Sequence, residues 1–112
     1  MKLIIAGSRE GFDWDDVHAG YVLPGFNATE IVSGCANGVD LLGEQLAYNL
    51  ELPVKRFPAQ WRVNGVYDNA AGYKRNVLMA EYADALLALR YNNSKGTTHM
   101  VEIAKKKGMP VY

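Results

Sequence analysis

The sequence predicts an α/β domain with a Rossmann-like, doubly wound parallel sheet of about five strands in the order 3-2-1-4-5 and helices on both faces. Three observations predict it. Short apolar runs alternate with segments of helical period. The runs are apolar throughout, as strands are when helices cover both faces of a parallel sheet. Right-handed crossovers then make this the most economical strand order. The 112 residues suffice for one domain over 1–112.

Each expected strand is a short apolar run that ends at a turn-forming residue. The first, 3–6, is rich in β-branched residues and stops at Gly7. Similar runs recur at 30–33 before Gly34, at 54–57 before Pro58, at 85–89 near Asn92, and at 110–112, where the sequence ends.

The segments between these runs carry apolar residues three or four positions apart, which is the period of a helix. The first of them follows an acidic turn, 13–16, that suits the positive end of a helix dipole. The stripes are Trp14, Val17 and Tyr21; Val39, Leu42, Leu46 and Leu50; Tyr73, Val77 and Ala80; and Met100, Ile103 and Ala104. One connection, from Pro58 to about Asn69, is long for a compact domain, and we expect a functional or mobile loop there.

Composition excludes several classes of protein. Twelve Lys and Arg balance twelve Asp and Glu, so no general attraction draws the chain to duplex nucleic acid or to an anionic membrane. The single cysteine, Cys35, excludes an intramolecular disulfide framework and every cysteine-cluster metal site. Charge appears within residues 1–10, too early for a signal peptide, and no run is long enough to span a membrane. We therefore expect a cytoplasmic protein without a metal or resident cofactor.

The expected site lies where the carboxyl ends of the first and fourth strands meet, because doubly wound sheets bind ligands at that switch point. Three loops converge there: 7–10, 33–38 and 92–98. They are rich in glycine and small hydroxyl residues, and two of them carry a cation, Arg9 and Lys95. Close backbone N–H groups, hydroxyls and helix N-termini are suited to a phosphate or pyrophosphate. Glycines in such loops also serve strand-to-helix turns without any ligand, but three loops converging on one edge favour a binding site.

Several side chains have two interpretations. Asp40 either closes a capping box on Asn37 or accepts a ribose hydroxyl. Arg75 and Asn76 either reach a phosphate or base or lie on a solvated helix face, and Trp61 is placed to stack on a base. Cys35 lacks a neighbouring base, and both histidines are interpreted as structural. The candidate ligand-binding residues are Gly7, Ser8, Arg9, Ser33, Gly34, Asn37, Gly38, Asp40, Trp61, Arg75, Asn76, Ser94, Lys95, Gly96 and Thr97.

Five motifs in this order resemble the small SLOG-superfamily proteins grouped as the YspA-like family. They are Gly7-Ser8-Arg9, the segment 33–40, the segment 57–61, the segment 71–76, and Ser94-Lys95-Gly96-Thr97. The resemblance implies a Rossmann-like domain that binds nucleotides or nucleotide-derived ligands, with the motif residues lining the pocket. More distantly, the chain is similar to DNA-processing protein A and to the cytokinin-activating phosphoribohydrolases. It has Met100 where the latter carry their catalytic glutamate, which argues against that hydrolysis.

The resulting hypothesis is a binding module that holds an ADP-ribose-like or cyclic nucleotide as a sensor or a sequestering protein, a role that would suit a phage protein directed against host nucleotide signals. One alternative is a hydrolase of an N-glycosidic or phosphoester bond that uses Asp40 or Glu10. Another is a single-stranded nucleic-acid binder with Trp61, Phe57 and Arg62 as its platform. Because the segment 58–69 carries apolar residues that a small monomer rarely exposes, we also expect a homo-oligomer.

Overall fold

The centre of the fold is a parallel sheet in the order β3-β2-β1-β6. A computed structural model describes residues 1–91 and 94–112. The strands are β1 (Lys2–Gly7), β2 (Glu30–Ser33), β3 (Val54–Arg56) and β6 (Ala85–Leu89). Because β6 is the fourth strand expected from the sequence, the predicted doubly wound α/β fold is confirmed. The expected fifth strand is reduced to one parallel bridge between Val111 and Leu86.

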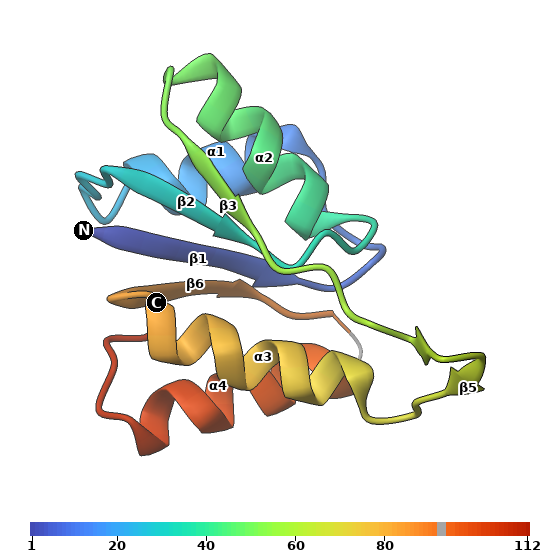
Figure 1. The fold of residues 1–112 in the computed structure, drawn as a ribbon. Coiled ribbons are helices and arrows are strands. Elements are labelled where there is room, and N and C mark those ends of the chain that lie inside the picture. The colour runs from blue at the N-terminus through green and yellow to red at the C-terminus, as the bar shows by residue number, and fades with distance from the viewer. Residues whose placement is uncertain (92–93) are drawn as a thin grey trace.

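Four helices cover the two faces of the sheet, two on each face (Figure 1). On one face lie α1 (Trp14–Val22) and α2 (Val39–Asn49), and on the other lie α3 (Ala71–Tyr82) and α4 (Lys95–Lys106). The connections that leave β1 and β6 therefore go to opposite faces, which places the switch point between these two neighbouring strands. None of the helices within the described ranges has the length and apolarity to cross a membrane.

Side chains of β1 alternate between two apolar clusters. Leu3 and Ile5 pack with α1 and α2, whereas Ile4 and Ala6 pack with α3 and α4. Burying an aliphatic side chain of this size contributes about 1.5–3 kcal/mol relative to leaving it exposed. Because β1 contributes to both clusters, it fixes where both helical layers sit.

The third helix buries a different face from the one predicted. Of the predicted stripe only Ala80 is buried, beside Met79, whereas Tyr73 and Val77 are 43% and 37% exposed. The N-terminal half of α3 lies beyond the ends of the strands, so its inward positions are occupied by Arg75 and Asn76, which line a pocket. The spacing of the apolar residues alone could not decide which of two overlapping faces of the helix, one with Tyr73 and Val77 and one with Met79, is buried.

The long connection contains a short antiparallel hairpin, β4 (Arg62–Val63) and β5 (Val66–Tyr67). Its turn is Asn64-Gly65 with φ of 52° and 78°, the pair that favours tight hairpins. The Asn64-Gly65 dipeptide is a sequence signal for a hairpin, so this turn could have been predicted. The hairpin projects from the body of the molecule (Figure 1) and forms what we call the hairpin arm, residues 61–68. Asp68 anchors its base through an N–H bond to the Trp61 carbonyl, 2.7 Å, and an ion pair with Lys74, 2.6 Å.

Candidate ligand-binding site

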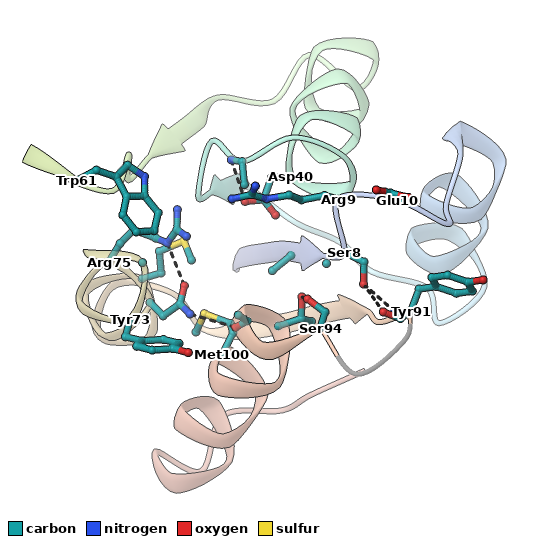
Figure 2. A pocket seen from close by; sticks show the side chains of 18 of the residues that line it. Ser8, Arg9, Glu10, Asp40, Trp61, Tyr73, Arg75, Tyr91, Ser94 and Met100 are labelled. Carbon is teal, nitrogen blue, oxygen red and sulfur yellow. Dashed lines mark hydrogen bonds between the residues drawn. The ribbon is translucent and has the colours of Figure 1, made fainter. Parts of the chain in front are cut away.

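A pocket of about 580 Å³ opens at the carboxyl ends of β1 and β6, at the predicted switch point. Three apolar side chains, Ala6, Met79 and Met100, contribute to its lining from β1, α3 and α4. Figure 2 shows Trp61, Arg75 and Tyr73 at one end of the pocket and Ser8 with Tyr91 at the other. A volume of this size falls within the range of ordinary small-molecule sites, about 300–1,000 Å³.

The structure brings most of the candidate residues together in this pocket. Those that line it are Gly7, Ser8, Arg9, Asp40, Trp61, Arg75, Asn76, Ser94, Gly96 and Thr97. Those that lie outside its lining are Ser33, Gly34, Asn37, Gly38 and Lys95. Positions 92 and 93 of the third loop fall outside the described residues.

The first loop is locked to the end of β6. The Ser8 hydroxyl accepts a hydrogen bond from the Tyr91 N–H at 2.7 Å, and the Ser8 N–H donates to the Leu89 carbonyl at 3.0 Å. Ser8 thereby holds the two loops in register while Arg9, the next residue, is exposed at the pocket. Because the backbone of this loop is already held, the ordering cost when Arg9 binds an anion is confined to its side chain.

Two glycines of the second loop shape the site from outside its lining. Gly38 has φ of 82°, and a Cβ there would lie 2.5 Å from the carbonyl oxygens of Ser8 and Arg9. A Cβ on Gly34 would lie 2.7 Å from Arg75 Nη1 and 2.8 Å from Asp40 Oδ2. Gly38 thus permits the close approach of two loops, and Gly34 leaves room for a cation and a carboxylate.

Ser33 belongs to the support of the second loop. Its hydroxyl donates to Glu44 Oε2 at 2.7 Å and accepts from the Cys35 N–H at 3.1 Å. Glu44 also pairs with Arg56 at 2.8 Å. Burial, followed by the charge of Glu44, raises the pKa of the Cys35 thiol, which disfavours a thiolate nucleophile at this position.

Arg75 and Asn76 tie three elements together across the pocket. Arg75 donates from Nη1 to the Gly34 carbonyl and from Nε to Asn76 Oδ1, the latter at 3.0 Å. Asn76 Nδ2 donates to the Gly96 carbonyl and to His99 Nδ1, both at 3.2 Å. Asn76 is buried and Arg75 is half-buried, so these residues form an interior network rather than the solvated helix face considered from the sequence.

Asp40 is a buried carboxylate beside this network. It is 5% exposed and accepts a hydrogen bond from the Ala36 N–H at 3.2 Å. Because α2 begins at Val39 after an N-cap at Gly38, the capping box with Asn37 does not form. Burial raises the pKa of Asp40 to about 6, against the opposing effects of the Ala36 N–H, Arg75 and the Gly7 N–H.

Aromatic rings bound the pocket, and only Trp61 was a candidate from the residues themselves, although the resemblance also implied the segment 71–76 that contains Tyr73. Trp61 is 40% exposed and stacks on Tyr67 with ring centroids 6.1 Å apart. Tyr73 was assigned to the core, and Tyr91 was missed although it closely follows the β6 strand. The remaining lining residues outside the predicted set are Ala6, Glu10, Ala36, Asn69, Gly72, Met79 and Met100.

The fold and the pocket define a Rossmann-like α/β domain with a small-molecule-sized pocket at its switch point. No protein-family model and no curated protein matches the chain. Among solved structures it is similar to DNA processing protein A (DprA) from Streptococcus pneumoniae, with a TM-score of 0.79 and 18% identity over 98% of this chain and 48% of that chain.

A second similar structure is DprA from Helicobacter pylori, described for its single-stranded DNA binding mode. Its TM-score is 0.65, with 16% identity over 99% of this chain and 63% of that chain. The chain therefore spans less than two thirds of either relative. At such identities the likeness establishes a shared DprA-like fold.

The raised pKa of Asp40 predicts a stability cost that grows with pH. The folded state holds this proton up to about pH 6, whereas the unfolded state releases it near 3.8. The free energy of unfolding therefore falls as pH rises between these values, by about 3 kcal/mol in total and about 2 kcal/mol between pH 4.5 and 7.5. Urea unfolding of Asp40→Asn should lack this fall. Asp15→Asn, on the exposed face of α1, should keep it, and an unchanged pH profile in Asp40→Asn would contradict the assignment.

Proposed function

We propose that the protein binds a nucleotide-derived small molecule in this pocket and acts as a sensor or a sequestering protein. The observation that carries the proposal is the convergence of an exposed arginine, aromatic rings and a buried carboxylate around one cavity of about 580 Å³. A nucleotide needs these three kinds of partner, for its phosphate, its base and its ribose hydroxyls.

Arg9 is the phosphate partner in this proposal. It leaves the central strand at the switch point, and a guanidinium engages two phosphate oxygens at once. The hydroxyl of Thr97 and the backbone N–H groups at the start of α4 lie at the same cavity and add donors. Arg75 is already bonded to Gly34 and Asn76, so its role is to hold the walls and supply positive potential.

The rings of Trp61 and Tyr73 provide faces on which a base stacks, and Asp40 provides the acceptor for a ribose hydroxyl. Within this class we favour an ADP-ribose-like or cyclic nucleotide, in keeping with the resemblance to the YspA-like SLOG proteins. Sequestration of such a signal by a phage protein is one setting that this chemistry would serve.

Single-stranded nucleic acid is the second candidate ligand. The likeness to a DprA described for single-stranded DNA binding favours it, as does the exposed hairpin arm with Trp61, Arg62 and Tyr67. A strand would bind along the arm and lose affinity steeply with salt, whereas a mononucleotide would be held inside the pocket.

We expect a thermal-shift panel of nucleotides, dinucleotides, ADP-ribose and cyclic nucleotides to identify the ligand class. At a ligand concentration a hundredfold above Kd, binding to the folded state adds about 2.7 kcal/mol, roughly 10 °C in Tm for a domain of this size. Arg9→Ala should weaken binding by about ten- to a hundredfold in calorimetry, because it removes a charge-assisted hydrogen bond. Lys107→Ala, which removes one charge at the far end of α4, serves as control. No shift with any of these ligands would refute the proposal.

We expect binding without turnover. Met100 occupies the position of the phosphoribohydrolase glutamate and lines the pocket, which leaves Asp40 and Glu10 as its carboxylates. Chromatography of excess ligand over hours should show no product. Steady product formation that disappears in Asp40→Asn or Glu10→Gln would establish the hydrolase alternative instead.

We also expect self-association through the hairpin arm. Val63, Val66 and Tyr67 are 50%, 68% and 54% exposed there, and a second copy would cover them. Light scattering at micromolar concentration should give a mass above one chain, and Val66→Lys should lower it. Leu23→Lys, an exposed apolar residue on a different part of the surface, is the matched control, and a monomeric wild-type mass would contradict this expectation.

A further inference from the structure

A second hollow, of about 470 Å³, adjoins the first pocket. Its lining residues are Tyr73, Arg90, Lys95, Thr98, His99 and Glu102. Tyr73 belongs to both linings, so its ring borders both cavities. Lys95, expected from the sequence to join Arg9 around one phosphate, lies here instead.

Helix α4 is the wall between the two cavities. Ser94, at its N-cap, and three residues of the helix line the first pocket, and Lys95, Thr98, His99 and Glu102 line the second. At 100° per residue the two sets occupy opposite sides of the helix. The N-terminal turn of α4 lies between the two sets of residues, so a ligand that crosses this turn reaches both cavities.

At Gly96 the N-terminal turn of α4 presents no side chain. A Cβ at position 96 would meet no heavy atom within 4 Å among the described residues, so packing does not demand glycine there. The position lines the first pocket and is exposed. Its carbonyl is held by Asn76, which fixes the backbone at the crossing. A backbone position without a side chain lets a ligand approach closely.

The second hollow is cationic. Arg90 and Lys95 supply two positive charges against the single carboxylate of Glu102. His99 is neutral: Arg75 Nε donates to Asn76 Oδ1, so Asn76 Nδ2 must donate to His99 Nδ1 and the ring proton lies on Nε2. Burial lowers the pKa of His99 in agreement with this arrangement. Thr98, held by Arg90 at 3.3 Å, adds a hydroxyl.

We propose that this hollow is a second phosphate subsite, so that the ligand is a nucleotide with two phosphoryl groups set apart from one another. The inference rests on the proposed function, because the first pocket must hold the nucleoside. The Cα atoms of α4, the helix that separates the subsites, lie on a cylinder about 5 Å across. Two phosphates joined directly, as in a nucleoside diphosphate or ADP-ribose, are too close together to lie on both sides of it, whereas groups on either side of a ribose or in two nucleotide units can do so. Within the proposed class, the second subsite therefore favours a nucleoside bisphosphate or a ligand of two nucleotide units over ADP-ribose and cyclic mononucleotides.

The test compares ligands that differ in the presence or the position of a second phosphate. Calorimetry with adenosine 5′-monophosphate, adenosine 5′-diphosphate and adenosine 3′,5′-bisphosphate, and with the guanosine series, should show a preference of about tenfold or more for the bisphosphate. Lys95→Ala should reduce that preference about fivefold, and Glu102→Gln should increase it about two- to threefold. Lys107→Ala, at the C-cap of the same helix and outside both linings, should leave the preference unchanged.

The outcomes separate the two proposals. Nucleotides that bind with equal affinity whether or not they carry the second phosphate would overturn the second subsite and leave the proposed function standing. If nothing in either series binds, the second subsite is overturned, and the proposed function is then decided by the wider thermal-shift panel, which includes ADP-ribose and cyclic nucleotides. A single-stranded hexadeoxyadenylate that binds in a Lys95-dependent manner, together with no bisphosphate preference, would assign the hollow to a polynucleotide and overturn the assignment to a free nucleotide.

Discussion

The hydrogen bonds of Arg75 and Asn76 are the constraint on which the site depends. Arg75 donates to the Gly34 carbonyl on the loop after β2. Asn76 donates to the Gly96 carbonyl and to His99 on α4. Hydrogen bonds to a charged group contribute about 1.5–3 kcal/mol each. The network therefore fixes the width of the pocket between the loop after β2 and α4. The apolar side chains of α3, such as Met79, then pack closer to the sheet than Arg75 and Asn76 do.

Much of the fold was predictable because buried positions require apolar residues, and their spacing can be seen in the sequence. A parallel sheet covered on both faces makes its inner strands almost entirely apolar, and that pattern located β1, β2 and β6, whereas β3 contains the exposed Lys55 and Arg56 and was located by its place before Pro58. The final strand was overestimated, since three residues at an edge give no sign of how many ladder bonds they make. Asp13, in the acidic turn expected at the start of α1, forms a capping box with Asp16.

The site was predictable in position but not in the role of each residue. Loops at the switch point were located from the strand order, whereas side-chain direction depends on which face of a helix meets the sheet. Lys95 and Gly96 are neighbours in sequence and line different cavities for this reason. Ser33 has the composition of a ligand-binding residue, yet its hydroxyl is bonded to Glu44, which is eleven positions away and invisible to a motif.

The pairing of β1 with β6 has a consequence for how the protein is made. Leu3 lies opposite Ala85, and the pocket draws its walls from residues as far apart as Ala6 and Met100. During synthesis β1 cannot pair with β6 until residues 85–89 have been made. The long segment between the two strands must then bring them together before their contacts can form. Until β6 leaves the ribosome, β1 can pair only on its β2 side. The pocket at this edge therefore forms only after β6 and α4 have been synthesised.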